Sequence, residues 1–140
     1  MNMQDLPFDA DAALERLRGW VEIESPTFDS AAVNKAMDRA ADDLAAIGGR
    51  TARIPGTMGY GDCVVAQFGA TGPGILVMGH LDTVHPVGTL EVLPFAIKDG
   101  RCSGPGILDM KSGCVAALEA IASLSRAARK TPLPVTVLLT

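Results

Sequence analysis

A histidine and an aspartate two positions apart are the strongest candidates for chemistry in this 140-residue chain. His80 and Asp82 lie in the segment GHLDT, residues 79–83, directly after the apolar run at residues 75–78. In an extended chain, side chains at i and i+2 point the same way, so the two should project together. Imidazole is a good zinc ligand, and a neighbouring carboxylate can accept its other ring N–H and fix the tautomer. An ordinary surface pair is the alternative for so short a pattern.

A second acid lies in the Gly/Pro-rich segment GPGILDMKSG, residues 104–113. This segment places Asp109 at the mouth of a predicted helix. Taken alone, an aspartate there is more often a helix cap, which also suits the helix dipole. However, both candidate segments follow predicted strands and flank one loop. We therefore predict that His80 and Asp109 approach each other closely, with Asp82 behind His80.

Other reactive side chains are weaker candidates. His85 is interpreted as a loop histidine, and Lys111 as a residue that is solvated or paired with a nearby acid. A nucleophilic Cys102 would need a partner base, and the only two histidines lie near residue 80. The glycine-rich segment 69–74 matches neither a dinucleotide fingerprint nor a phosphate-binding loop, and it precedes a strand rather than a helix.

Three amphipathic helices must help to position these residues, as apolar residues at helical spacing indicate. The first is expected to end at Ser25, because the residue before a proline resists the helical region. Asp29 or Ser30 can cap the second helix, and the glycines at 48–49 stop it. The third helix starts near Ser112.

Strands are predicted between the helices, at residues 50–54, 63–68, 75–78 and 135–139. The run at 75–78 is continuously apolar, which is typical of strands buried on both faces of a sheet, and 135–139 is predicted to be a further buried strand. Helices alternating with apolar strands indicate an α/β sandwich. The last strand is also the end of the chain, although function in open α/β sheets lies just beyond the carboxyl ends of strands. We therefore expect the chain to be truncated.

Composition excludes several classes of protein. The sequence is 48% hydrophobic and 20% charged, which is typical of a globular rather than a disordered chain. Its net charge of -4 gives no electrostatic reason to expect nucleic acid or an anionic membrane as partner. No apolar run is long enough to span a membrane, and residues 1–9 lack the features of a secretory signal. Three cysteines without a CxxC pair agree with the cytoplasm as the expected compartment.

Together, the two candidate segments resemble the M20 metallopeptidase family, and within it the glutamate carboxypeptidases. The matching segments are MGHLDTV at 78–84, PVGTL at 86–90, LPF at 93–95 and the glycine-rich stretch at 104–113. Weaker similarity occurs at IESP, residues 23–26, and IPG, residues 54–56. The resemblance therefore covers nearly the whole chain.

The resemblance implies an α/β fold with a mixed, mostly parallel sheet flanked by helices, and a co-catalytic pair of zinc ions in each complete site. By the family's pattern, His80 binds one metal ion and Asp109 bridges both. Asp82 has a catalytic role without binding metal, because it orients His80. The family also has a cis peptide after the bridging aspartate, which here is the Asp109-Met110 bond.

The implied function is that of an enzyme, a metal-dependent hydrolase that cleaves an amide or peptide bond next to a C-terminal amino acid by a metal-activated water. The substrate would be a small peptide or an acyl-amino acid. The segment at 86–90 favours carboxypeptidases that release a C-terminal glutamate. Acyl-amino-acid deacetylases and dipeptidases of the same family remain open.

Several parts of the family's pattern are missing from residues 1–140. The family follows its equivalent of the last strand with a Glu-Glu pair, which supplies the general base and a metal ligand. Another acidic ligand, a late histidine and a lid domain used for dimerisation and substrate grip come further on. We therefore interpret the chain as the amino-terminal part of one catalytic domain, inactive alone, whose parent forms a homodimer through the lid. A non-catalytic fragment that binds a partner or one metal ion weakly is the alternative, and the reading frame after Thr140 distinguishes the two.

Overall fold

The computed structural model describes residues 6–129, 131 and 133–140 and has an α/β fold. Its main sheet is mixed and has four strands. Its strands, in spatial order, are β1 (Arg50–Ile54), β2 (Cys63–Phe68), β6 (Val135–Leu139) and β3 (Ile75–Gly79). β2 pairs antiparallel with both β1 and β6, whereas β3 runs parallel to β6. The sheet is therefore mixed, as expected, and its described strands contain one parallel pair rather than a parallel majority.

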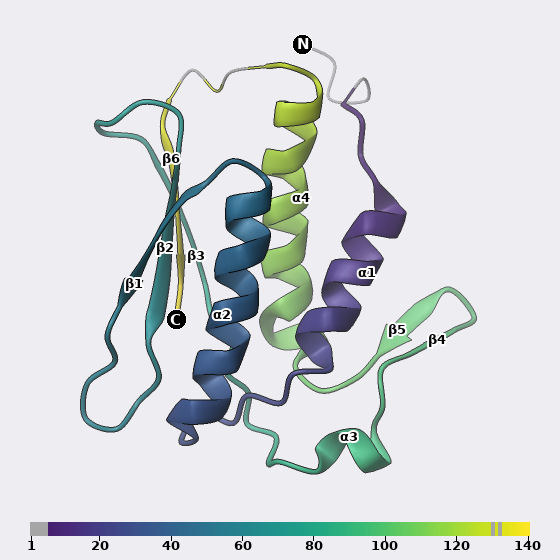
Figure 1. The fold of residues 1–140 in the computed structure, drawn as a ribbon. Coiled ribbons are helices and arrows are strands. Elements are labelled where there is room, and N and C mark those ends of the chain that lie inside the picture. The colour runs from purple at the N-terminus through teal and green to yellow at the C-terminus, as the bar shows by residue number, and fades with distance from the viewer. Residues whose placement is uncertain (1–5, 130, 132) are drawn as a thin grey trace.

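Three long helices cover one face of this sheet (Figure 1). They are α1 (Ala10–Val21), α2 (Ser30–Ala46) and α4 (Ser112–Arg126). The predicted cap of α2 is confirmed, because the Asp29 carboxylate accepts a hydrogen bond from the Ala32 N–H at 2.9 Å. α1 ends at Val21, ahead of the predicted end at Ser25, so that prediction was wrong. The residues between α1 and α2 instead form a connector that reaches the candidate site.

The hydrophobic core lies between the helices and the covered face of the sheet. Its fully buried side chains include Trp20, Met37, Leu44, Leu118 and Leu139. The indole N–H of Trp20 donates to a carboxylate oxygen of Asp43 at 2.6 Å, which links α1 to α2 while both remain packed on the core. This packing holds α1 and α4 in place above the strands that lead to the site.

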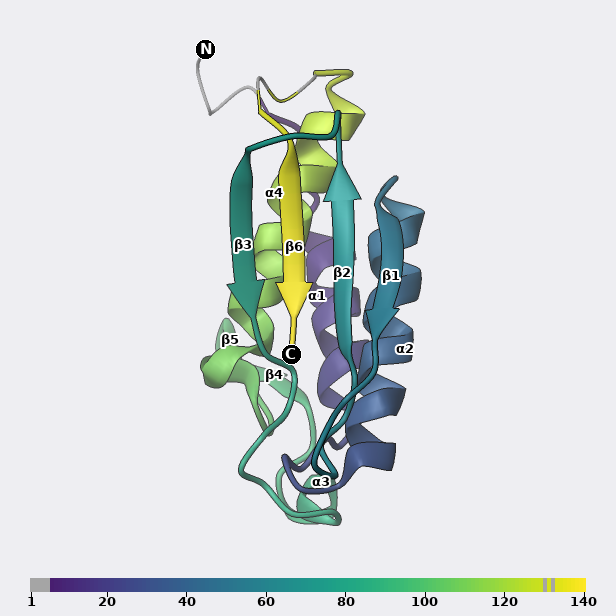
Figure 2. The ribbon, with the colours of Figure 1, turned by 90° about the vertical axis from the view of Figure 1, so that its left-hand side faces the viewer.

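The opposite face of the sheet carries no described helix (Figure 2). On β3, Leu76 is 56% exposed and Met78 is 59% exposed. The prediction that β3 is buried on both faces was therefore wrong. β3 lies at the edge of the described sheet with helices on one side only, whereas β6 lies between two strands and buries every second residue.

Two short elements interrupt the long segment between the candidate site residues. They are helix α3 (Thr89–Val92) and a hairpin of β4 (Ala96–Lys98) and β5 (Arg101–Ser103). Asp99 and Gly100 connect the two strands, and both have positive φ, at 51° and 72°. An Asp-Gly pair is a strong signal for such a turn. The hairpin was not among the elements predicted from the sequence.

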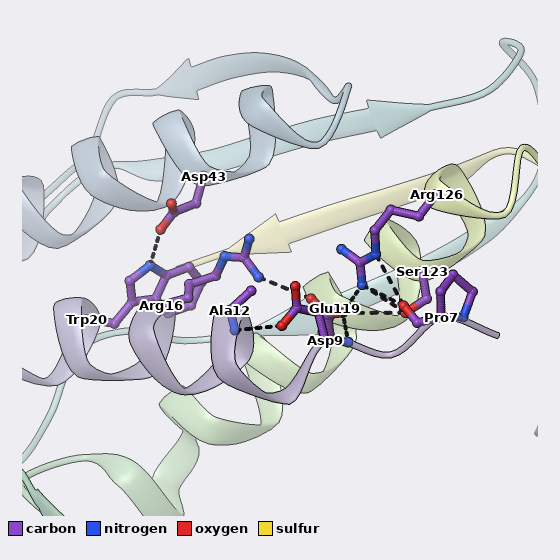
Figure 3. A network of polar contacts seen from close by, with 9 residues as sticks. All are labelled: Pro7, Asp9, Ala12, Arg16, Trp20, Asp43, Glu119, Ser123 and Arg126. Carbon is purple, nitrogen blue, oxygen red and sulfur yellow. Dashed lines mark hydrogen bonds and ion pairs between the residues drawn. The ribbon is translucent and has the colours of Figure 1, made fainter.

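A buried carboxylate joins the amino-terminal segment to α4 (Figure 3). Glu119 has no exposed surface and pairs with Arg126 on its own helix and with Arg16 of α1, the latter at 3.5 Å. It also accepts a hydrogen bond from the backbone N–H of Asp9 at 3.0 Å. Pro7 is held nearby, because its carbonyl accepts from the Arg126 guanidinium. This network fixes the start of α1 against α4.

Among the residues that the structure describes, no helix is both long and apolar enough to span a membrane. The expectation that the chain carries no secretory signal rests partly on residues 1–5, which lie outside the described residues.

Candidate metal centre

The two candidate segments meet at the end of β3. His80 directly follows this strand, and Asp109 belongs to a single turn, η2 (Ile107–Lys111), that leads into α4. The Nε2 atom of His80 lies 3.0 Å from a carboxylate oxygen of Asp109. The predicted close approach of the two side chains is therefore what the fold produces, although their metal-binding roles stay predictions.

Asp82 lies on the other side of the His80 ring. Its carboxylate Oδ1 is 3.2 Å from His80 Nδ1, and its backbone carbonyl is 3.1 Å from the same nitrogen. The structure thus places Asp82 behind His80, as the spacing of two residues predicts. In this arrangement Nδ1–H can donate to Asp82, which leaves the Nε2 side for another partner.

Asp109 does not cap α4. The residue at the cap position of that helix is Lys111, which makes no side-chain cap hydrogen bond. Asp109 has extended backbone angles, φ -131° and ψ 96°, and is followed by a cis peptide bond to Met110. Its side chain is 84% exposed, and its carboxylate lies 3.0 Å from His80 Nε2. The helix-cap interpretation is therefore wrong, and the carboxylate is free to bind a ligand.

The burial and hydrogen-bond partners of Lys111 differ most from what was expected from the sequence. It is 1% exposed, and its ammonium donates to the backbone carbonyls of Trp20 and Ile23, both at 2.9 Å. Burial lowers the pKa of Lys111 to about 8, although the charges of Asp82 and Glu24 oppose that shift. The prediction of a solvated or acid-paired lysine was wrong. Lys111 instead ties the turn that carries Asp109 to the carboxyl end of α1.

The candidate residues line an open cavity of about 210 Å³. His80, Asp82 and Asp109 line it, together with Thr27 from the connector and His85 from the loop. No hydrogen bond or ion pair links His85 to the other candidates among the described residues. His85 is a loop residue, as interpreted, and its lack of a metal role stays a prediction.

Two glycines allow the approach of the segments that form the cavity. A Cβ at Gly79 would lie 2.4 Å from the Cys114 sulfur, so a side chain there would push β3 away from α4. Gly106 has φ of 72° and would meet a methyl group of Thr83 at 2.6 Å. Glycine is needed at both positions, for close approach at the first and for the positive φ as well at the second.

The donor atoms fit part of a metal site. A neutral imidazole nitrogen and a carboxylate oxygen are both accepted zinc ligands with bonds of about 2.0–2.2 Å. Two such ligands of one tetrahedral ion lie roughly 3.3 Å apart by the same bond lengths. The 3.0 Å between His80 Nε2 and Asp109 needs only a small widening. Within the described part of the chain, no group of three His, Cys, Asp or Glu side chains is placed to hold an ion.

The charge state of His80 reflects its neighbours. Burial lowers its pKa, but the hydrogen bond to the Asp82 carbonyl and the carboxylates of Asp109 and Asp82 outweigh burial and hold the pKa above 6.5. Without a metal ion, the two carboxylates therefore favour the imidazolium. A cation would have to displace that proton from Nε2.

Glu24 is a positioning residue that the sequence analysis missed. Its two carboxylate oxygens accept the backbone N–H groups of Gly88 and Leu90, each at 2.9 Å. These two hydrogen bonds lower the pKa of Glu24 more than burial raises it. The carboxylate therefore anchors the loop between His80 and Asp109 at the beginning of α3.

We expect Glu24→Gln to loosen this loop without unfolding the protein. Glutamine turns an NH₂ donor toward one of the two N–H groups, so one hydrogen bond is lost. Backbone amide exchange at Gly88 and Leu90 should become roughly 3–10-fold faster, as expected for the loss of one such bond. Glu22→Gln is the matched control, because Glu22 is exposed and in the same connector. Equal protection in both variants would contradict the role of Glu24.

The wild-type loop should respond to acid in the same way. The folded-state pKa of Glu24 lies below its ordinary 4.5. The stabilisation is therefore complete above pH 4.5 and is lost as the pH falls through the lower folded-state pKa. Amide protection at Gly88 and Leu90 should follow this course in the wild type and be flat in Glu24→Gln.

Comparison with known proteins identifies the family. Residues 76–140, which include both candidate metal ligands, match the profile described as Peptidase family M20/M25/M40. The chain belongs to the M20 peptidase family. It is 32% identical to carboxypeptidase G2 of Pseudomonas sp. (strain RS-16) over 104 residues, which are 73% of this chain and 25% of that protein. It is 39% identical to succinyl-diaminopimelate desuccinylase of Anaplasma marginale (strain Florida) over 74 residues, 49% of this chain and 19% of that protein.

Solved structures of peptidases share the fold of this chain. Human carnosine dipeptidase 1 superimposes with a TM-score of 0.76 at 23% identity, over 92% of this chain and 31% of that protein. The M20 family metallo-carboxypeptidase of Sulfolobus solfataricus gives a TM-score of 0.75 at 20% identity, over 92% of this chain and 30% of that protein. The α/β fold is therefore the one found in these peptidases. This M20 chain spans about a quarter or less of the length of the two curated relatives.

Proposed function

We propose that residues 1–140 form the amino-terminal part of one M20 catalytic domain and supply part of its metal centre. The observation that carries the proposal is the meeting of His80 Nε2 and the Asp109 carboxylate at 3.0 Å, with Asp82 on the far side of the ring. Two side chains 29 positions apart thus present the donor types that zinc prefers at the mouth of one cavity. An incidental surface pair would not need the third residue behind the histidine.

In this proposal the complete site holds two zinc ions. His80, through Nε2, and the Asp109 carboxylate would be the metal ligands that this chain supplies, and Asp82 would orient His80. Metal ions in such a site act as Lewis acids that polarise the scissile carbonyl and lower the pKa of water toward neutrality. The residues of this chain would bind the metal ions and orient the ligand His80. The general base and the remaining ligands must come from outside the described residues.

The proposed reaction is hydrolysis of an amide or peptide bond next to a C-terminal amino acid, with glutamate as the favoured residue. Similarity to carboxypeptidase G2 over 73% of the chain supports cleavage next to a C-terminal amino acid, whereas the preference for glutamate rests on the resemblance of residues 86–90. Similarity to a succinyl-diaminopimelate desuccinylase supports a second candidate, an acyl-amino-acid deacylase of the same family. Both candidates require the same residues from this chain and differ in the acyl group and amino acid recognised.

The test compares residues 1–140 with the product of the complete coding sequence, using zinc, acyl-glutamates, other acyl-amino acids and dipeptides. We expect hydrolysis only from a product that supplies a general base, because a catalytic zinc needs about three protein ligands and a positioned base contributes about 10²–10⁴-fold. A chelator and His80→Ala should each abolish it. Chelator-sensitive turnover by residues 1–140 would refute the incomplete-site proposal. Turnover that is insensitive to both chelator and His80→Ala would refute the metal-centre proposal.

A further inference from the structure

The connector between α1 and α2 pairs with the segment that carries Asp82. The backbone N–H of Thr83 donates to the Ser25 carbonyl at 2.8 Å, and the N–H of Thr27 donates to the Thr83 carbonyl at 3.1 Å. The Ser25 hydroxyl donates to the Leu81 carbonyl at 2.6 Å. Ser25 is fully buried, and Thr83 is 7% exposed. The connector is therefore held in register beside the candidate site, although it lies more than fifty positions away in the sequence.

This pairing places the Thr27 hydroxyl against the Asp82 carboxylate. Thr27 Oγ1 lies 2.5 Å from Asp82 Oδ2, whereas it lies 3.3 Å from the Thr83 carbonyl. A hydroxyl has one proton, and an ionised carboxylate only accepts, so the short contact is a donation from Thr27 to Asp82. The other carboxylate oxygen, Oδ1, lies 3.2 Å from His80 Nδ1, and the Asp82 backbone carbonyl accepts from the same nitrogen at 3.1 Å. Each oxygen of Asp82 thus has its own partner.

Lys111 does not replace Thr27 in this role. Its charge acts on Asp82 from within the fold, but its ammonium donates to the carbonyls of Trp20 and Ile23. Within the described part of the chain, Thr27 makes the side-chain hydrogen bond that fixes Oδ2. Loss of its hydroxyl would leave the carboxylate with only the contact of Oδ1 to His80, and its plane would be less well fixed because the terminal torsion is broad.

We propose that Thr27 is a positioning residue of the metal centre. Its hydroxyl holds the plane of the Asp82 carboxylate, and this carboxylate, together with the Asp82 backbone carbonyl, keeps the proton of neutral His80 on Nδ1. The Nε2 lone pair then faces the cavity and Asp109. This role rests on the proposed function for its biological meaning. The property that it predicts directly is the tautomer of His80.

The experiment measures this tautomer by ¹⁵N NMR in the metal-free chain at about pH 9, above the ordinary imidazole pKa of about 6.5. The chain has only two histidines, so His85 serves as an internal reference. All proteins carry Asp109→Ala, because Asp109 would otherwise compete for an Nε2 proton. We expect Thr27→Val to lower the Nδ1–H to Nε2–H ratio of His80 about twofold or more, with the Asp82 backbone carbonyl still accepting from Nδ1, and Thr27→Ser to retain the ratio.

Thr51→Val is the matched control, since Thr51 is exposed on β1 and lacks a side-chain hydrogen bond in the described structure. If Thr27→Val does not fold, Thr27→Ala is compared with Thr27→Ser, which isolates the hydroxyl. An unchanged His80 ratio in the hydroxyl-deficient variant would overturn the inference, as would an equal change in Thr51→Val. A selective change that Thr27→Ser rescues supports it. If the complete protein hydrolyses nothing while this response persists, the proposed function fails and the positioning role stands.

Discussion

Asp109→Ala, made in the product of the complete coding sequence, is expected to lose more bound metal than His80→Ala. Neither variant should retain measurable activity. In the proposed site Asp109 touches two ions and His80 touches one. Loss of a residue that only supports a ligand typically costs 10–100-fold in metal affinity or activity. Removal of a metal ligand itself should therefore lower metal affinity or activity by more than about 100-fold. Metal content after extensive dialysis measures the loss directly.

His85→Ala is the control for this prediction. His85 lines the same cavity as His80 but contacts neither His80 nor Asp109 through a described hydrogen bond. Its replacement should leave the metal content unchanged. Equal stoichiometry in wild type, His80→Ala and Asp109→Ala would exclude both residues as ligands. A loss in His85→Ala as large as that in His80→Ala would show that the cavity, rather than the proposed donor pair, determines binding.

The central part of the candidate site could be predicted because it depends on short-range rules. The orientation of His80 and Asp82 follows from the two-residue period of an extended chain at the end of β3. Asp29 acts as the predicted cap of α2 because an N-cap interaction spans only three residues. Glycines and apolar runs set the bounds of β1, β2 and β6 closely. The approach of Asp109 to His80 was predicted from the placement of both segments after predicted strands, whereas its assignment as a metal ligand came from the resemblance, since an acid near a helix start also suits a cap.

The supporting residues could not be predicted, because their partners are remote in the sequence. Glu24 binds backbone groups 64 and 66 positions away, and Thr27 reaches a carboxylate 55 positions away. Lys111 donates to carbonyls 91 and 88 positions away that become accessible only because α1 ends at Val21. No local periodicity encodes such contacts. For this reason Lys111, at a predicted helix start, was expected to be solvated or paired with an acid, although the fold buries it.

The largest effect on stability is expected from Glu119→Ala. The variant removes the carboxylate between Arg16 and Arg126 and leaves the Asp9 N–H without its acceptor. Removing one partner from a buried ion pair typically costs 3–5 kcal/mol, because the remaining charge is uncompensated. The Arg126 side chain is 37% exposed and can turn toward water, whereas that of Arg16 is only 14% exposed. We therefore expect a loss of about 3 kcal/mol in the free energy of unfolding.

Denaturant unfolding of Glu119→Ala and of the control Glu15→Ala measures this loss. Glu15 also pairs with an arginine, Arg18, but its side chain is 77% exposed, so its replacement should cost less than about 1 kcal/mol. In Glu119→Leu, a second replacement, Arg16→Leu, should recover part of the lost stability, because it removes the buried charge left unpaired. Such a recovery would locate the cost in the unpaired arginine. If Glu119→Ala is no less stable than Glu15→Ala, the network in Figure 3 does not hold the start of α1 against α4.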